Sequence, residues 1–376
     1  MYVEHLTLHA FRSWTDLEVP LPAGVTSFVG ANGQGKTNIV EAVDYLSRLS
    51  SHRVASDAPL VKQGFEQAVV RASVVKDGRS ALLEVEINPG RSNRARVNKS
   101  PLPRARDLVG LVRTVLFSPE DLALVKGDPS ERRRFLDDLM VLRAPRLAGV
   151  KADYDRVLKQ RNALLKNAAQ DRRRGGEYFA STLSVWDEQL VRFGAELVRV
   201  RADLVDELGP RLADAYAEVA KDASRSEARV RYQPSVPVSR ETEAPAADRA
   251  EVEAAFHEAL ATRRSEELQR GLTLVGPHRD ELTLAVGTLP VKGYASHGES
   301  WSYALAMRLA AYDLLRSDGD DPILILDDVF AELDSHRRER LAERVSGAEQ
   351  VLVTAAVGAD IPAVLSGHRV DVRRQE

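Results

Sequence analysis

The chain has 376 residues, of which 44% are hydrophobic and 29% charged, with a formal net charge of −3 and no cysteine. This composition is typical of a soluble globular protein, and the length exceeds one ordinary core, so two or more lobes are expected. The charge balance gives no global indication of a nucleic-acid binder, the lack of cysteine excludes disulfides and thiolate metal sites, and no apolar run approaches the roughly 20 residues of a membrane span.

Residues 1–11, MYVEHLTLHAF, alternate polar and apolar side chains as a β-strand does. They lack the basic and then apolar pattern of a secretory signal. A cytoplasmic protein is therefore expected.

A phosphate-binding loop is predicted after the first strands. The sequence GANGQGKT at 30–37 matches the pattern G-x-x-x-x-G-K-[ST]. An apolar run of strand type, Val25–Val29, precedes it. Apolar residues recur at helical spacing after it, at Ile39, Val40, Val43 and Leu46. Strand, glycine turn and helix are the context that this motif requires.

The chemistry of such a loop comes from its backbone and two side chains. Small residues let successive N–H groups surround a phosphate chain at the start of a helix. Lys36 is expected to reach the β- and γ-phosphates of ATP, and the Thr37 hydroxyl to bind Mg²⁺. Arg12, in the stretch FRSW, is expected to face the nucleotide. The predicted nucleotide-binding residues of this region are Arg12, Gly30, Ala31, Asn32, Gly33, Gln34, Gly35, Lys36, Thr37 and Asn38.

Residues up to 118 show strand alternation, with a hairpin predicted near Pro89–Asn93. Candidate DNA-binding residues there are Arg91, Arg94, Arg96, Lys99, Arg104 and Arg106, followed by the runs Arg132–Arg134 and Arg172–Arg174. Several cations on one face can hold phosphates, whereas solvated surface charge is the alternative for each run. Arg132 and Arg133 have the further alternative of ion pairs inside the fold. Because aromatic residues are not interleaved, we expect salt-sensitive, sequence-independent binding to the DNA backbone.

The sequence becomes helical from 119 to 270. Apolar residues recur close to heptad spacing at Leu183, Trp186, Leu190, Phe193, Leu197, Val200, Leu204 and Leu208. Gly209–Pro210 is expected to interrupt this helix. Helices around 154–165 and 252–260 are expected to oppose it and to return the chain, and the Pro-rich stretch 233–248 is expected to be a loop or a disordered tip. A short antiparallel arm is the expectation, and a compact helical bundle is the alternative.

A strand that ends in carboxylates is the usual partner of a P-loop. The apolar run Ile323–Leu326 is followed by Asp327 and Asp328. Asp327 is expected to hold Mg²⁺, together with Thr37, and Asp328 to orient or deprotonate the attacking water. Alone, this stretch would be an ordinary strand–loop junction. With the P-loop it predicts a hydrolytic site in which Lys36, Asp327 and Asp328 are the catalytic residues.

The order of the motifs resembles that of ABC-type ATPase heads. Asp334 lies where such heads have a D-loop, residues 350–355 (QVLVTA) lie where they have the strand before the switch position, and ASHGES (295–300) takes the place of their signature sequence. By itself ASHGES would be a helix N-cap for residues 302–315. The resemblance instead implies that Ser296, Gly298, Glu299 and Asp334 contact nucleotide across an ATP-dependent homodimer.

The resemblance also defines the expected fold. It is an α/β, Rad50/SMC-like P-loop ATPase head formed by 1–118 plus 271–376. A mostly helical second lobe, 119–270, is inserted between the P-loop and the signature and forms a short antiparallel arm.

Longer stretches are similar to the RecF family of bacterial DNA replication and repair proteins over nearly the whole chain. They are FRSW, GANGQGKTNIVEAV, FSPEDLALVKGDPSERRRFLD, GPHRDEL, ASHGES and ILDDVFAELDSHRRERL. The resemblance implies ATP and Mg²⁺ as cofactors, slow hydrolysis, and binding of single-stranded DNA and single-strand–double-strand junctions. It further implies a nucleoid-associated location, RecR with RecO as partners, an indirect link to RecA loading, and support of replication and the SOS response.

Three departures from the wider ABC pattern imply weak catalysis. Asp328 stands where glutamate is usual, Thr354–Ala355 where transporters carry a switch histidine, and SHGES in place of SGGQ. ATP is therefore expected to act as a timed clamp. Ser118–Asp121 is expected to couple the site to the arm. The sequence assigns no role to His52, nor to the trio His278, Arg279 and Asp280.

Other classes of protein fit less well. A transporter subunit would need a switch histidine and a membrane-coupled helical domain. A scaffold with a vestigial site would predict a degenerate Lys36 or Asp327, and both are intact. A nuclease head would need a further metal-binding domain, for which the chain has no room. Another SMC/Rad50-like ATPase or an ABC-type nucleotide-binding scaffold is the remaining alternative.

Overall fold

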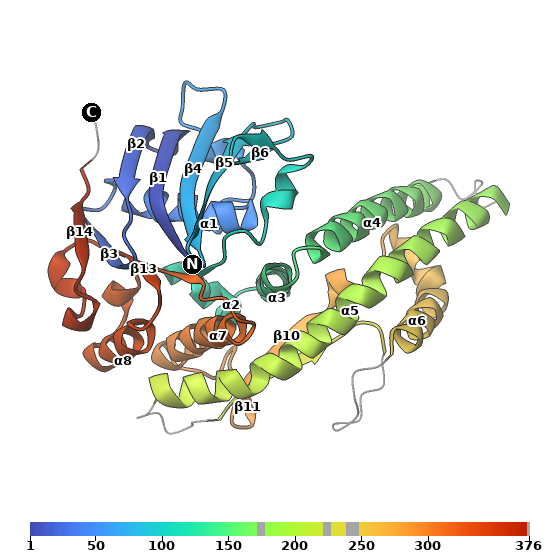
Figure 1. Ribbon diagram of the computed structural model, residues 1–376. Coiled ribbons are helices and arrows are strands. Elements are labelled where there is room, and N and C mark those ends of the chain that lie inside the picture. Colours follow the sequence, from blue (N-terminus) through green and yellow to red (C-terminus); the bar gives the residue numbers. More distant parts are fainter. Residues whose placement is uncertain (171–176, 221–226, 238–247, 374–376) are drawn as a thin grey trace. The chain divides into compact units, whose positions relative to one another are not determined.

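The computed structural model describes residues 1–170, 177–220, 227–237 and 248–373, and it divides into two compact units (Figure 1). Unit 1 comprises Met1–Lys126, Arg211–Ala228 and Val286–Glu376, and unit 2 comprises Gly127–Pro210 and Arg229–Ala285. The sequence-based division assigned 119–126, 211–228 and 271–285 differently. Contacts between residues distant in the chain account for the first two of these segments, since Asp121 pairs with Arg308 and the Tyr216 ring packs at a tilt against that of Tyr303 within unit 1.

Unit 1 contains a six-stranded antiparallel sheet. Its order is β2 (Trp14–Pro20), β1 (Tyr2–Phe11), β4 (Ala68–Lys76), β5 (Arg79–Ile87), β6 (Arg94–Val97) and β7 (Ser100–Pro101). Along β4, fully buried residues alternate with more exposed ones, as expected of a sheet with one face in a core. The hairpin of β5 and β6 confirms the one predicted near residues 89–93.

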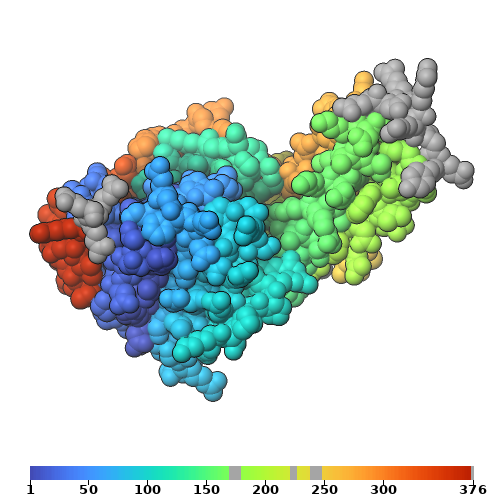
Figure 2. All heavy atoms as spheres, turned by 90° about the horizontal axis from the view of Figure 1, so that it is seen from above, coloured from blue at the N-terminus to red at the C-terminus, as the bar shows by residue number. Residues whose placement is uncertain are grey.

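The second sheet of unit 1 has five parallel strands. Its order is β14 (His368–Asp371), β3 (Gly24–Val29), β13 (Gln350–Ala355), β12 (Ile323–Asp327) and β8 (Thr114–Phe117). Every residue of β8, β12 and β13 is buried, as in parallel sheets covered on both faces. Because parallel strands end at one edge, the segments after β3 and β12 meet there. The pairing of β14 with β3 places a C-terminal strand beside an early strand of the chain, seen as neighbouring red and blue surfaces (Figure 2).

Helix α1 (Lys36–Arg48) packs into the core that the two sheets share. Ile39, Val40 and Leu46 lie in one cluster with apolar residues of β1, β4, β12 and β13. Unit 1 also contains α2 (Leu122–Lys126), α7 (His297–Ser317) and α8 (Ser335–Val345), and a short strand, β11, covers Leu289–Pro290. Strand β3, the glycine turn and α1 thus have the order predicted for a P-loop.

Unit 2 is mostly helical. Its elements are α3 (Pro129–Arg143), α4 (Leu147–Gln170), most of α5 (Glu177–Val219), α6 (Arg249–Arg270), and the greater parts of β9 (Ala228–Gln233) and β10 (Glu281–Val286). The predicted apolar seam lies on α5, where Leu183, Leu190 and Leu197 are fully buried. Helices α4, α5 and α6 lie alongside one another (Figure 1). None of the helices in the described ranges is long and apolar enough to span a bilayer.

The predicted interruption at Gly209–Pro210 is wrong, because α5 continues through Pro210 to Val219. A proline inside a helix lacks the N–H that would bond to the carbonyl four residues earlier, here that of Asp206. Asp206 and Pro210 are both exposed, so water can solvate the freed carbonyl. Leu208 and Leu212 are fully buried on either side, and their packing favours the continuous helix.

Ion pairs inside unit 2 join its three long helices. Arg161 of α4 is completely buried and donates to Asp187 of α5 over 2.8 Å and to Glu267 of α6 over 2.6 Å. It also donates to the hydroxyl of Thr273 over 2.8 Å. The buried Arg161 guanidinium is thus compensated by two carboxylates. Removing either carboxylate would leave its positive charge only partly compensated.

The residues 278–280, to which the sequence assigned no role, make internal contacts of unit 2. Asp280 is 1% exposed and accepts hydrogen bonds from Arg201, Tyr232 and the backbone N–H of Ser235. The Arg279 guanidinium donates to a backbone carbonyl, that of residue 273, over 3.1 Å. These contacts tie the GPHRDEL stretch to α5 and β9.

His278 makes the stability of unit 2 sensitive to acid. Its ring lies 2.7 Å from the Tyr154 hydroxyl, and burial lowers its pKa to about 4. Below its ordinary pKa of about 6.5, the unfolded chain gains a proton on this ring and the folded chain does not. The free energy of unfolding should therefore fall between about pH 6.5 and pH 4, by up to about 3 kcal/mol, and level off below.

Denaturant titrations at several pH values would measure this dependence, with His278→Gln as the non-titrating control. The wild type should lose stability relative to the variant as pH falls through that range. Parallel curves for the two proteins would contradict the prediction.

Candidate nucleotide site

The P-loop joins β3 to α1 along a path that only glycine permits at two positions. Gly35 has φ +98°, and a Cβ there would lie 2.8 Å from Ser13 Oγ. A Cβ on Gly30 would lie 2.4 Å from the carbonyl oxygen of Val372. The backbone therefore follows the tight path that a phosphate-binding loop requires.

Lys36 places a positive charge over this loop. Its side chain is buried, and Nζ donates to the carbonyl oxygens of Gly30, over 2.8 Å, and Ala31, over 3.3 Å. The ammonium group thus lies at the N-terminus of α1, where the helix dipole and unpaired N–H groups favour anions. The loop residues 31–33 are exposed, so a phosphate chain has access to them.

The stretch FRSW braces the loop from the side of β1 and β2. Trp14 Nε1 donates to the carbonyl oxygen of Gly35 over 3.3 Å, and Asn38 Nδ2 donates to Ser13 Oγ over 2.8 Å. Arg12 itself contacts Glu41 of α1 through two nitrogens, over 2.5 and 2.9 Å. The structure therefore shows Arg12 in an ion pair with α1, and its predicted contact with nucleotide stays a prediction.

The end of β12 faces the start of α1. Asp327 is 4% exposed, and its Oδ1 accepts from the hydroxyl of Thr37 over 2.9 Å and from that of Thr354 over 2.6 Å. Burial raises the pKa of Asp327, and the neighbouring charge of Asp328 acts in the same direction. Asp328 is half-buried, has φ +50°, and donates its backbone N–H to Thr354 over 2.9 Å.

This donor set fits a hard cation. A hydroxyl and a carboxylate within hydrogen-bonding distance are ligands that Mg²⁺ prefers, and the ion usually takes its other ligands from water and phosphate. Among the described residues, no group of three or more histidine, cysteine or acidic side chains could hold a metal by itself. The predicted ligands Thr37 and Asp327 therefore suit a metal ion that arrives with nucleotide.

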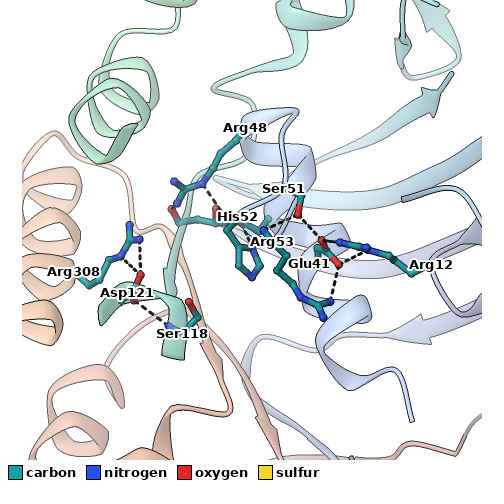
Figure 3. A network of polar contacts seen from close by, with 11 residues as sticks. Arg12, Glu41, Arg48, Ser51, His52, Arg53, Ser118, Asp121 and Arg308 are labelled. Atoms are coloured by element: carbon teal, nitrogen blue, oxygen red, sulfur yellow. Dashed lines mark hydrogen bonds and ion pairs between the residues drawn. The ribbon is translucent and has the colours of Figure 1, made fainter. Parts of the chain in front are cut away.

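Two buried carboxylates of α1, which the sequence interpretation missed, organise the segment after this helix (Figure 3). Glu41 accepts from Ser51 Oγ over 2.5 Å and from Arg53 over 3.3 Å, in addition to Arg12. Acidic residues at 41 and 44 on an otherwise apolar helical face were the available signal.

The second of these carboxylates, Asp44, lies beside β8. It accepts from Arg48 over 3.1 Å and from Thr114 over 2.7 Å, and the His52 ring is 3.7 Å away. Burial opposes ionisation, but the charge of Arg48 and these polar contacts hold the pKa of Asp44 well below its usual range. His52 thus lies beside Asp44, among the polar residues that contact α1.

The signature-like turn is the N-terminus of α7. Ser296 is the N-cap, its Oγ accepts from the Glu299 N–H over 3.2 Å, and the Glu299 carboxylate accepts from the Ser296 N–H over 2.8 Å. The His297 ring lies 3.4 Å from Lys126 Nζ of α2. The capping alternative is thus present in the structure, and it leaves the signature interpretation as a proposal.

Arg337 of α8 joins this turn to the predicted D-loop. Asp334 is the N-cap of α8 and accepts from the Arg337 N–H over 3.0 Å and from its guanidinium. Arg337 also donates to Ser302 of α7 over 2.9 Å, and a Cβ on Gly298 would lie 3.2 Å from its guanidinium. Residues 296–302 and 334–337 are therefore neighbours.

The segment Ser118–Asp121 links β8 to α7 (Figure 3). The Asp121 carboxylate accepts from the Ser118 N–H over 3.0 Å and from Arg308 of α7 over 2.6 Å. The segment is thus fixed to α7, the helix whose N-cap is Ser296. Coupling from here to the helical lobe stays a prediction.

The candidate DNA-binding cations differ in what they contact. Arg94 lies 3.5 Å from Glu86, and Arg96 forms an ion pair with Glu84 across the hairpin. Within the described ranges, no ion pair joins a carboxylate to the other four candidates, Arg91, Lys99, Arg104 and Arg106.

Arg132 and Arg133 are engaged inside unit 2. The Arg132 side chain is 7% exposed and makes a bidentate pair with Glu281 over 2.7 and 3.0 Å, and Arg133 donates to the backbone of Asp280. The alternative of internal ion pairs is therefore confirmed for Arg132. The run Arg172–Arg174 lies outside the described residues.

The fold and the site together define a P-loop ATPase head of the ABC type with an inserted, mostly helical lobe. A family model described as RecF/RecN/SMC N terminal domain matches residues 2–361. The chain is 60% identical to the DNA replication and repair protein RecF of Nocardioides sp. (strain ATCC BAA-499 / JS614), covering 100% of this chain and 99% of that protein. It is 59% identical to the RecF of Streptomyces avermitilis, covering 99% and 98%.

A solved structure of the recombination mediator protein RecF-ATP in RecFOR pathway has the same fold. The TM-score is 0.87 at 26% identity, over 96% of this chain and 93% of that one. The chain belongs to the RecF family.

Proposed function

We propose that this chain is an ATP-dependent DNA-binding clamp of recombinational repair. The observation that carries the proposal is the pairing of Lys36, held over a glycine-dependent loop, with Thr37 and Asp327, whose oxygens are 2.9 Å apart. The RecF-ATP structure, of the same fold, supports ATP as the nucleotide. The names of the curated relatives support a role in DNA replication and repair.

The residues at the site have separable tasks in hydrolysis. Lys36 and the P-loop N–H groups bind and orient the phosphates. Thr37 and Asp327 would hold Mg²⁺, which when bound with ATP supplies charge stabilisation at the phosphoryl oxygens. Asp328 is placed one residue further on to orient or deprotonate water. We expect slow turnover, far below the roughly ten per second of a median enzyme.

The proposed homodimer uses the turn at the start of α7. In this arrangement Ser296 and Gly298 contact the nucleotide held by Lys36 of a second copy, with Glu299 and Asp334 close by. Support comes from Arg337, which contacts Asp334 and Ser302 and so fixes the two segments together. Each copy would then hold an incomplete site.

DNA binding and partners are further parts of the proposal. The substrate would be single-stranded or gapped DNA. Its phosphate backbone would be held by the side chains of Arg91, Lys99 and neighbouring cations of the antiparallel sheet. RecR, with RecO, would be the protein partners, and RecA loading and SOS induction would follow indirectly in the cytoplasm. The RecFOR pathway named for the solved relative supports this assignment.

The proposal is tested by sedimentation velocity of the full chain with and without Mg-ATP and a single-strand–double-strand junction. A monomer without nucleotide should become a dimer with Mg-ATP, and the junction should sediment with it. A particle that stays monomeric at saturating Mg-ATP, with and without DNA, would overturn the proposed clamp.

Ser296→Arg separates ATP binding from pairing. The larger, charged side chain should block the approach of a second copy while each monomer still binds ATP. Loss of the N-cap should cost only about 1 kcal/mol of stability. Sedimentation and a fluorescent-nucleotide titration on the same sample would measure both properties.

Asp248→Arg is the matched control, because it removes a similar capping box, at α6 in unit 2. It should leave ATP-dependent pairing intact. Normal pairing by Ser296→Arg would show that this turn is only a helix cap.

A further inference from the structure

The side chain of Thr354 contacts both carboxylate residues at the end of β12. Thr354 is fully buried in β13 and lies opposite Asp327 in the parallel register. Its hydroxyl lies 2.6 Å from Asp327 Oδ1 and 2.9 Å from the backbone nitrogen of Asp328. One hydroxyl therefore meets a predicted metal ligand and the backbone of the predicted general base.

Chemistry fixes the direction of both hydrogen bonds. A backbone N–H only donates, so Oγ1 accepts from Asp328, and its single proton is available for Asp327. Asp328 has φ +50°, in the left-handed region that residues other than glycine rarely adopt. The contact with Thr354 stabilises that conformation. The conformation in turn determines the direction in which the Asp328 side chain points after the end of β12.

The same hydroxyl restricts Asp327. The Thr37 hydroxyl donates to the same oxygen, Oδ1, over 2.9 Å. The carboxylate of Asp327 cannot rotate without losing both hydrogen bonds. Thr354 thus fixes both the orientation of the Asp327 carboxylate and the backbone of Asp328.

We propose that Thr354 is a positioning residue for ATP hydrolysis, acting through Asp327 and Asp328 and not on the nucleotide. This inference rests on the proposed function and adds a residue to it. Thr354 belongs to the pair Thr354–Ala355 that stands where the wider ABC pattern has its switch histidine. In this chain the same strand supplies a buried hydroxyl that contacts Asp327 and Asp328.

Thr26 shows what a merely space-filling threonine looks like in this sheet. It is fully buried in β3, and its hydroxyl has no hydrogen-bond partner among the described residues. Thr26→Val therefore serves as a control for removing a buried hydroxyl from the same sheet.

The decisive variant is Thr354→Val, which keeps the branched shape and loses the hydroxyl. Single-turnover hydrolysis should fall by about 10–100-fold, the range found when a group that orients a metal ligand is removed. The affinity for a non-hydrolysable ATP analogue should stay within about three-fold, because the P-loop and Lys36 supply most of the binding. Thr354→Ser, which keeps the hydroxyl, should recover hydrolysis, and Thr26→Val should change neither quantity.

Metal binding gives a readout besides activity. With the analogue bound, Mn²⁺ affinity can be measured by electron paramagnetic resonance. Thr354→Val should weaken Mn²⁺ binding by about 10-fold, whereas a purely structural threonine would leave it unchanged.

Two results would overturn the inference: hydrolysis by Thr354→Val at the wild-type rate, or an equal loss in Thr354→Ser. If the valine variant does not fold, Thr354→Ala and Thr354→Ser decide, because both remove the methyl group and only serine keeps the hydroxyl; equal rates would then reject the role. A wild type that neither binds nor hydrolyses ATP would instead overturn the proposed function itself.

Discussion

Lys36→Ala is expected to abolish ATP binding, with at least a 100-fold loss of affinity, or about 3 kcal/mol. Lys36 is buried and its ammonium lies 2.8 Å from the Gly30 carbonyl oxygen, so it is already fixed where the β- and γ-phosphates would lie. Alanine removes this charge and leaves the loop N–H groups as the main source of attraction. Without bound ATP, the proposed dimer should not form at any practical nucleotide concentration.

A fluorescent-nucleotide titration, followed by sedimentation with Mg-ATP, measures both effects. Lys166→Ala, an exposed lysine of α4 in unit 2, is the matched control and should behave as the wild type. Retention of ATP binding by Lys36→Ala would mean that this loop is not the nucleotide site.

The elements around the site could be predicted from the sequence because their signals are local. Val25–Val29, the glycine turn and the helix after Lys36 follow from side-chain spacing over a few residues. The strand Gln350–Ala355 has the same bounds in the structure as in the sequence interpretation. A cap at Ser296 is equally local, since Ser296 and Glu299 form their hydrogen bonds within one turn.

Contacts between distant segments could not be predicted from spacing. Arg132 pairs with Glu281, 149 residues away, so a basic run on one helix does not reveal that a carboxylate covers it. Arg96 pairs with Glu84 because of the register of β5 and β6, which side-chain alternation alone does not define.

Thr354 had no sequence signal as a contact of Asp327. A threonine near the end of a strand is ordinary, and its contact depends on β13 lying beside β12 in one particular register. The continuity of α5 through Pro210 is similar, because burial on both sides of the proline outweighs the local preference for a break.

Asp328→Asn should separate ATP binding from hydrolysis and leave the ATP-bound dimer trapped. The change keeps the size of the side chain and the backbone N–H that donates to Thr354. Asparagine also tolerates the left-handed conformation at φ +50°. It cannot accept a proton from water as a carboxylate does, so hydrolysis should fall by about 100-fold or more, within the range for loss of a general base.

Phosphate release and sedimentation over the same time course would measure this effect. Asp77→Asn is the matched control, because Asp77 has φ +51° and is exposed in the turn between β4 and β5. The wild-type dimer should decay as phosphate appears, and the Asp328→Asn dimer should persist with ATP intact. Undiminished phosphate release by Asp328→Asn would assign activation of water to another group. Loss of the dimer instead would show that the Asp328 carboxylate is needed to hold ATP, so that binding and hydrolysis cannot be separated at this residue.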